Sequence, residues 1–260
     1  METGQMDKCS VTLDRCPDAE TLLHLYEGER MLREMKEVKL LFESLLRCCS
    51  RERLVEMFSN EYFRLELMPS SRRDQFRELF NNETFHVRHV RSVMSLLTGK
   101  ENFHDHSKNG FTISLLTLWF NILPEQLKTG PLSEWVGKEI NRHYRMENGH
   151  HPEKALFCPG FKFDAESLLE MAIDRASRSL QFSDRGEIED ESMKFHEPKF
   201  QEDHEKLVGI YWELYQVIKK PTKETWDMLK RGAEPVLKLR RWELKNFSNV
   251  LTNAEKCLKE

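Results

Sequence analysis

Histidine is unevenly distributed along this 260-residue chain. Seven of the ten histidines fall between positions 86 and 151. Imidazole is a common side-chain ligand for transition metals, and it also transfers protons near neutral pH. A cluster of this density has three common causes, which are metal ligation, proton transfer and chance, and the residues around it help to choose among them.

The pair His104-Asp105 precedes the most apolar stretch of the chain, residues 113–123, and hydrophobic periodicity predicts one buried helix over 103–123. Burying the Asp105 carboxylate there without a partner would cost several kcal/mol. A metal ion is the strongest partner because it binds imidazole and carboxylate together. The alternative is that Asp105 caps the helix and that His104 is exposed.

Other segments carry residues of the same types. On a predicted helix over 84–97, His86 and His89 lie on or beside the apolar stripe, although each has the alternative of being a core histidine. Asp174 follows three apolar residues in mid-helix, which is a poor position for a bare carboxylate. Adjacent histidines also follow a turn after His143. The candidate metal ligands are His89, His104, Asp105, His143, His150, His151 and Asp174.

Helical periodicity dominates the rest of the chain, and no stretch alternates as a strand would. Ser50 and Asp164 are typical N-cap residues, Gly99 is a typical residue after a helix end, and Pro131 is a typical first residue. The predicted helices cover 31–45, 50–58, 71–80, 84–97, 103–123, 131–144, 164–180 and 207–218, with two short helices beyond Pro221 and the break at 232–235. We therefore expect an all-α fold.

The chain divides into four parts on this reading. Residues 1–80 are expected to form an N-terminal helical region that packs on a metal-binding core at 81–182. Eleven of the 21 residues in 183–203 are charged, so this segment is expected to be a loop, a lid or a linker. Residues 204–260 are expected to form C-terminal helices.

Composition limits the classes of function. The formal net charge is −4, which gives no general attraction to nucleic acid or acidic membranes. No stretch has the ~20 apolar residues that span a bilayer, and the N-terminus lacks the pattern of a secretory signal. The six cysteines form no C-x-x-C pair, so we expect the reducing environment of the cytoplasm or nucleus. An oligomer is compatible with this composition.

A basic segment near the C-terminus offers a different reading. Residues 219–245 contain nine Lys or Arg against four Asp or Glu, with Trp226 and Trp242 among them. Such a face could bind a phosphate backbone. Tryptophans in this setting are more often core residues and the lysines solvated, so nucleic-acid binding is disfavoured.

The order of the candidate ligands, H…HD…H…HH…D, resembles the HD superfamily of metal-dependent phosphohydrolases. A branch with a domain of unknown function is the closer likeness, because it carries H-D-x-S-K and N-x-H-H-P-E motifs. Both occur here, at 104–108 and 148–153, and the resemblance covers about 85–180. It implies an HD-like helical bundle with additional N- and C-terminal helices.

The resemblance also implies roles for the ligands. His89, His104, Asp105 and Asp174 would form a first site, with Asp105 bridging two metals. His143 and one or both of His150 and His151 would complete a second. The fifteen-residue spacing to His104 favours His89 over His86, which stays open. Ser107 departs from the superfamily's usual glycine, which leaves the standard phosphate chemistry in question.

The implied activity is hydrolysis of a nucleotide or another small phosphoester with one or two divalent ions, namely Mn, Fe, Zn, Co or Mg. Asp105 and Lys108 would be the catalytic residues, and Lys108 would also bind substrate phosphate. One or two of the arginines near the ligands would supply further phosphate contacts, and the rest would form surface salt bridges; the candidates are Arg142, Arg145, Arg175 and Arg178. The alternatives are a di-iron oxygenase of the HD type and a non-catalytic metal-binding or scaffold protein.

Overall fold

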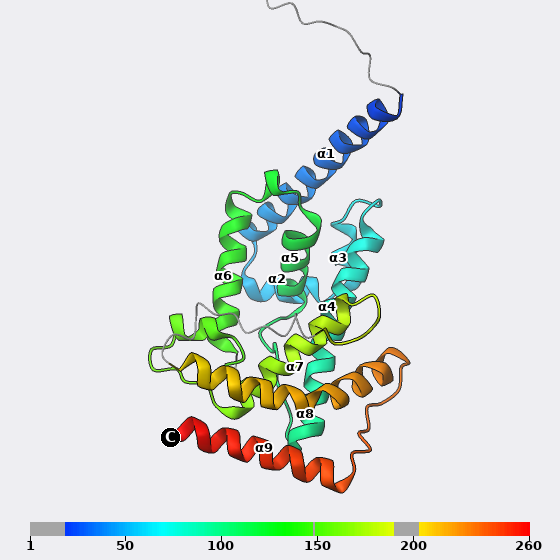
Figure 1. The fold of residues 1–260 in the computed structure, drawn as a ribbon. Helices are drawn as coiled ribbons and strands as arrows, with labels where there is room; N and C mark the ends of the chain where they lie inside the picture. The colour runs from blue at the N-terminus through cyan, green and yellow to red at the C-terminus, as the bar shows by residue number, and fades with distance from the viewer. Residues whose placement is uncertain (1–18, 148, 190–202) are drawn as a thin grey trace, which may run out of the picture.

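The computed structural model describes residues 19–147, 149–189 and 203–260. Every regular element in these ranges is a helix, so the all-α prediction is confirmed (Figure 1). The longer helices are α1 (Ala19–Cys48), α2 (Arg51–Phe58), α3 (Glu61–Glu66), α4 (Arg73–Thr98), α5 (Gly110–Thr117), α6 (Pro131–Met146), α7 (Ala165–Phe182), α8 (His204–Lys230) and α9 (Arg241–Lys259). Three short helical segments of other types are the π-helix η1 (Leu118–Ile122) and the 3-10 helices η2 (Glu125–Leu127) and η3 (Pro152–Leu156).

Local chemistry explains several helix ends that the sequence predicts. The Ser50 side chain accepts a hydrogen bond from the Arg53 amide at the start of α2, and Asp164 caps α7 in the same way. Pro131 is the first residue of α6, and Gly99 ends α4 with φ +69°. These four predictions are confirmed.

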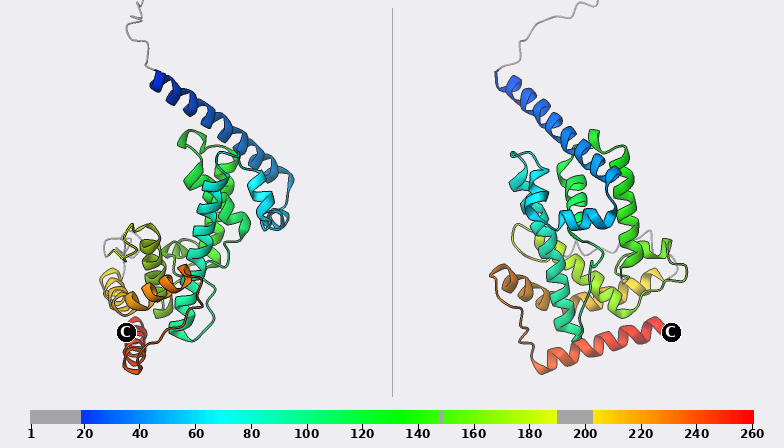
Figure 2. Two further views of the ribbon diagram at one scale, coloured as in Figure 1. Left: turned by 90° about the vertical axis from the view of Figure 1, so that its right-hand side faces the viewer. Right: turned by 180° about the vertical axis from the view of Figure 1, so that it is seen from behind.

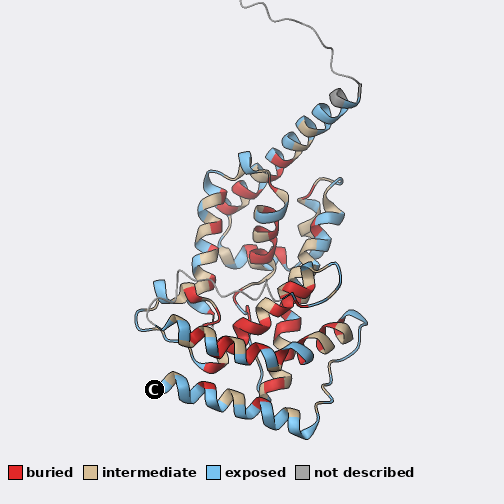
Figure 3. Ribbon diagram, in the orientation of Figure 1, coloured by how far each residue is buried: buried red, intermediate tan, exposed pale blue. Residues whose placement is uncertain are grey.

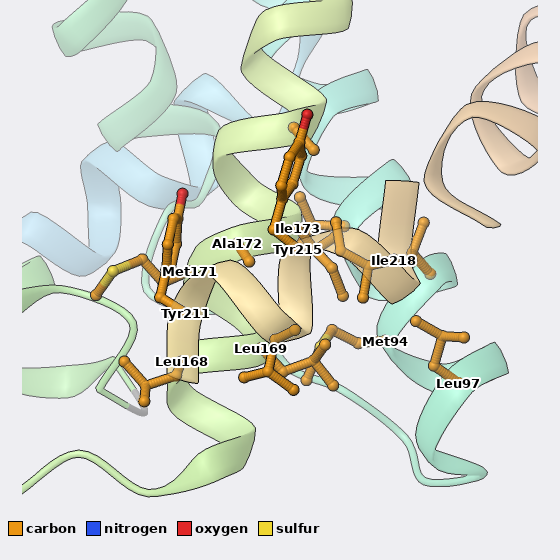
Figure 4. Packing of buried hydrophobic residues seen from close by; sticks show 14 of the residues in the cluster. Met94, Leu97, Leu168, Leu169, Met171, Ala172, Ile173, Tyr211, Tyr215 and Ile218 are labelled. Carbon is orange, nitrogen blue, oxygen red and sulfur yellow. The ribbon is translucent and has the colours of Figure 1, made fainter. Parts of the chain in front are cut away.

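The helices bury two separate hydrophobic clusters, which Figure 3 shows as two groups of buried residues. The N-terminal cluster gathers side chains of α1, α2, α5 and α6, among them Phe42, Phe58 and Phe111. The C-terminal cluster gathers side chains of α7, α8 and α9. In Figure 4, Tyr211 and Tyr215 of α8 lie among side chains of α7. The clusters do not follow the expected boundaries at 80 and 182.

Helix α4 belongs to both clusters, because it contributes Phe76 to the first and Val90, Val93, Met94 and Leu97 to the second. The sequence predicts two helices here, and the structure has one continuous helix of 26 residues. No glycine or proline separates the two predicted segments, so nothing stops the helix between them. The predicted break at 81–83 is therefore wrong.

The segment that carries His104-Asp105 also differs from its prediction. Residues 104–107 form a turn, and the helix that was expected from 103 begins at Gly110. Asn109 caps that helix by accepting from the Thr112 amide at 3.1 Å. A side chain at Gly110 would place its Cβ only 2.8 Å from the Phe58 carbonyl oxygen. The tight packing of α5 against α2 therefore fixes where the turn ends.

At the C-terminal end, α8 continues through Pro221, where the sequence predicts a break. Buried residues lie on both sides of the proline, including Ile218 and Trp226, so packing against α7 and α4 outweighs the lost backbone hydrogen bond. Helix α9 is the single helix after it within 203–260. Most of the charged segment 183–203 lies outside the described residues.

The early turns of α1 extend away from the other helices (Figure 2). Within the described ranges, no helix combines the length and the apolar character that a membrane crossing requires.

Candidate metal centre

The candidate ligands meet where the two hydrophobic clusters adjoin. Helix α4 supplies His86, the turn after it His104 and Asp105, and α6 His143. The loop before η3 supplies His150 and His151, and α7 supplies Asp174. Five of these seven residues are buried, while His151 and Asp174 are partly exposed. Segments up to 88 positions apart in the sequence thus converge on one point.

Among the described residues, three groups of nitrogen and oxygen atoms have the spacing that a metal ion requires, and the third of them joins Glu170 to His104 and His150. The first group contains His86, His104 and Asp174, and the second contains Asp105, His143, His150 and His151. Within each group the ligand atoms all lie within 4.8 Å of one another. A cation about 2.1 Å from each ligand atom separates opposite ligands by about 4 Å, so the spacing fits.

Asp105 belongs to the second group, and its other carboxylate oxygen faces the first group. Its Oδ2 atom is 3.5 Å from Nε2 of His104, while its Oδ1 atom is 3.2 Å from Nε2 of His143. Burial alone would raise the pKa of Asp105, but His104, Lys108 and His150 hold it well below its usual range. The ionised carboxylate therefore presents one oxygen to each group.

The backbone at Asp105 is unusual. Its φ of +53° is the one positive value among the non-glycine residues of the described ranges. Strained backbone of this kind costs of order 1 kcal/mol or more and is concentrated at functional sites. The turn from His104 to Ser107 holds this conformation, and the conformation aims the carboxylate inward.

Several buried polar atoms at this point lack a partner. Nε2 of His104, Nε2 of His150 and Oδ1 of Asp105 are shielded from solvent, and none makes a hydrogen bond within the described residues. Unsatisfied buried polar atoms are rare in proteins and usually indicate a missing ion or water. Here three such atoms face one centre, so the residues fit a metal ion.

Glu170 of α7 supports one histidine from each group. Its Oε1 atom accepts a hydrogen bond from Nδ1 of His104 at 2.8 Å. The same oxygen lies 2.9 Å from Nδ1 of His150, at an angle poor for a hydrogen bond. Burial would lower the pKa of His150, but the carboxylates of Asp105 and Glu170 raise it to about 10. The centre thus attracts positive charge.

A second support holds His143. The Ser107 hydroxyl donates to Oε1 of Glu147 at 2.6 Å and lies 2.7 Å from Nδ1 of His143. Because the hydroxyl hydrogen is used by Glu147, the oxygen accepts from Nδ1–H of His143. The Nε2 lone pair of His143 is therefore free to face Asp105 and His151. The Nε2 atoms of His143 and His151 lie 2.8 Å apart.

His89 is the one predicted ligand that the structure places elsewhere. Its Nδ1 lies 2.7 Å from the Ser177 hydroxyl, and its Nε2 lies 3.0 Å from the carbonyl oxygen of Thr222. His86 takes the predicted place, with Nε2 2.7 Å from Oδ1 of Asp174. The preference for His89 over His86 is therefore corrected. His89 lies three residues further along α4 than His86, and its ring faces α8.

The sequence predicts five phosphate-binding cations, and Lys108, Arg142, Arg145 and Arg178 among them differ in what they contact. Lys108 is bonded to Asp105, with Nζ 2.6 Å from Oδ2. Arg142 donates hydrogen bonds to the Ser107 carbonyl and to Glu139. Arg178 donates to both carboxylate oxygens of Glu83. Arg145 is exposed and lies over the Phe157 ring. Of the four, Lys108 alone contacts a candidate ligand.

Sequence reasoning missed the roles of Glu147 and Glu170. Each lies four residues from a proposed ligand: Glu147 follows His143 and caps the end of α6, and Glu170 precedes Asp174 on the same face of α7. Glu170 is also buried among apolar neighbours on α7. A carboxylate at that spacing in an apolar helix was a usable signal.

No protein-family model matches the chain, and neither the curated proteins nor the solved structures include a match. The feature of the described residues that bears on function is this centre, a largely buried set of His and Asp side chains with supporting carboxylates that could hold a metal ion.

Proposed function

We propose that this protein is a metal-dependent phosphohydrolase that acts on a nucleotide or another small phosphoester. The observation that carries the proposal is the position of Asp105 between two groups of ligand atoms, with one oxygen facing each. Sites with two ions bridged by a carboxylate are typical of enzymes that transfer or hydrolyse phosphoryl groups.

Each ion would have its own set of ligands. His86, His104, Asp174 and Oδ2 of Asp105 would hold one, and the other would be held by Oδ1 of Asp105 with His143, His150 and His151. Imidazole and carboxylate suit manganese, iron, zinc or cobalt better than they suit magnesium, which prefers oxygen ligands. Bound ions would polarise a phosphoryl oxygen and lower the pKa of water toward ~7.

Lys108 would bind the substrate. Its side chain is 13% exposed and its ammonium group lies against Asp105, so it borders the centre on the solvent side. Asp174, 19% exposed, and the partly exposed His151 are the other members of the centre that reach solvent. A phosphate entering there meets Lys108, which can neutralise charge that develops on its oxygens.

A di-iron oxygenase is the second candidate. Three of the four ligands in the second group are imidazoles, and such a set also suits iron. Oxygen consumption by protein loaded with ferrous iron, without phosphate release, would favour this candidate and contradict the first.

Elemental analysis of protein purified without added metal tests the centre. We expect about one to two ions per chain in the wild type and fewer than about 0.1 in His104→Ala/Asp105→Ala, because both groups lose a ligand. The matched control is His24→Ala/Asp74→Ala, which removes an exposed histidine and an exposed aspartate far from the centre. Wild-type protein that stays free of metal after reconstitution contradicts the proposal.

Release of inorganic phosphate tests the chemistry. Nucleoside monophosphates, diphosphates and sugar phosphates are offered to protein loaded with manganese, zinc or cobalt. We expect turnover of at least one class in the wild type and in the control variant, and none in His104→Ala/Asp105→Ala. Loaded protein that releases no phosphate from any of them contradicts the hydrolase assignment and leaves the metal centre standing.

A further inference from the structure

A buried chain of polar contacts leads away from the metal centre, starting at His86. Nδ1 of His86 lies 3.0 Å from the Ser177 hydroxyl, which lies 2.7 Å from Nδ1 of His89. Nε2 of His89 then reaches the carbonyl oxygen of Thr222 at 3.0 Å. Both histidines and Ser177 are fully buried, so the chain joins α4, α7 and α8 without solvent.

Only one arrangement of hydrogens fits neutral rings along this chain. The Thr222 carbonyl can only accept, so Nε2 of His89 must donate to it. Burial lowers the pKa of His89 to about 3, so its ring is neutral and Nδ1 is an acceptor. The Ser177 hydroxyl therefore donates to His89, and its oxygen accepts from Nδ1–H of His86.

The reverse arrangement is unfavourable. If Ser177 donated to His86 instead, Nδ1 of His89 would carry its hydrogen and Nε2 would be bare. Two acceptors, that nitrogen and the Thr222 oxygen, would then face each other at 3.0 Å in the interior. Such a pair is unfavourable, because both buried acceptors are left without a hydrogen bond.

The His89 ring is also held in place by its aromatic neighbours. It stacks on Phe85 at 6.4 Å and meets the edge of Trp226 at 5.1 Å. These contacts restrict rotation of the ring, so its two nitrogens keep their separate partners. The hydrogen bond from His89 to Thr222, which ends this series of polar contacts, is therefore held in one geometry.

We propose that Ser177 and His89 are positioning residues, which fix the tautomer and ring orientation of His86 so that its Nε2 lone pair points at a metal ion. The inference rests on the proposed metal centre. A neutral His86 with its hydrogen on Nδ1 presents a bare Nε2 to Oδ1 of Asp174 at 2.7 Å. Two acceptors at that distance repel unless a cation lies with them, and a metal ion satisfies both.

Nitrogen NMR of the histidine rings tests the hydrogens directly. Protein labelled with ¹⁵N-histidine is measured without metal and after loading with Zn²⁺, which is diamagnetic. We expect His89 to carry its hydrogen on Nε2 in both states, and His86 to carry its hydrogen on Nδ1 in the zinc-loaded state. A hydrogen on Nδ1 of His89 in the wild type overturns the proposal.

Zinc affinity tests the consequence. Ser177→Ala removes the contact to both rings but no ligand, and we expect it to weaken the first zinc group about 10- to 100-fold in competition with a chelator. Ser177→Thr keeps a hydroxyl and should recover most of the affinity. The matched control is Ser179→Ala on the same helix, a buried serine that accepts from the Glu189 amide instead.

The outcomes separate this inference from the proposed function. Ser177→Ala that folds, by its thermal unfolding, and binds zinc like the wild type overturns the positioning role but leaves the metal centre intact. A wild type that binds no metal contradicts the proposed function, and the positioning role toward a metal falls with it. In that case the His89 tautomer in metal-free protein still decides the direction of the hydrogen-bond chain.

Discussion

The hydroxyl oxygen of Ser107 lies 2.7 Å from Nδ1 of His143. A residue without a side-chain hydroxyl could not make this contact. Ser107 also donates to Glu147, through both its amide at 3.0 Å and its hydroxyl. Ser107 therefore supports a proposed ligand, His143, and joins it to Glu147.

This contact predicts that Ser107→Ala weakens the ion held by His143 about 10-fold or more, because the imidazole loses the partner that fixes its tautomer. Chelator competition with zinc or cobalt measures the change. Ser114→Ala is the control, since Ser114 is equally buried on α5 and its hydroxyl makes no hydrogen bond within the described residues. Equal affinities in the wild type and Ser107→Ala would show that the serine is not needed.

Lys108→Met is expected to reduce kcat/KM for a phosphoester about 100-fold, because it removes a positive charge from the place where substrate oxygens would lie. Metal content should stay at the wild-type level or rise, since the lysine no longer competes for Asp105. The control is Lys100→Met, which removes a lysine that pairs with Glu166 at the surface. Loss of metal together with activity would instead make Lys108 a structural partner of Asp105.

Glu170→Gln should weaken both ions about 10- to 100-fold, because one carboxylate oxygen contacts a histidine of each group. Ser107→Ala, by contrast, should affect the second group alone. Titration with two resolved binding steps distinguishes these patterns. Glu166→Gln, in the first turn of α7 and with its side chain 41% exposed, is the matched control. A change in only one step would contradict the shared role of Glu170.

Glu139→Gln is expected to lower the free energy of unfolding by about 1–3 kcal/mol at pH 7, because it leaves two partly buried arginine groups without their charged partner. The Glu139 carboxylate accepts from Arg51, Thr112 and Arg142. Burial alone would raise its pKa, but these donors bring it below the usual 4.5.

The pH dependence of this effect has a definite sign. A depressed pKa in the folded state gives stability that is present above the unfolded value of 4.5 and lost as pH falls through the folded value. The difference between wild type and Glu139→Gln should therefore shrink below about pH 4.5. Urea unfolding at pH 7, 5 and 3.5 measures it, and a difference that stays constant over this range would contradict the assignment.

Features set by neighbouring residues could be predicted from the sequence. Ser50, Asp164, Pro131 and Gly99 act through their own backbone or an amide within three residues, so the local pattern contains the information. The gathering of histidines was visible as well, because residue type and burial cost are properties of each short segment.

Features set by distant contacts could not be predicted. His86 and His89 look alike in the sequence, and the choice between them depends on Asp174 and on Thr222, which is 133 positions from His89. Arg142 and Arg178 were expected to bind substrate because they lie near ligands. Their carboxylate partners, Glu139 and Glu83, could be identified only from the folded structure.

Helix α4 runs unbroken from one hydrophobic cluster to the other, and the ligands of the centre come from both sides of this junction. Bound ions would therefore hold α6 against α7. The helices around the N-terminal cluster and those around the C-terminal cluster would then open in one step. In native-state hydrogen exchange, amides of α5 and α8 should share one opening free energy when the protein is loaded with zinc. Without metal the two helices should exchange with separate values, since α4 is then their main common support.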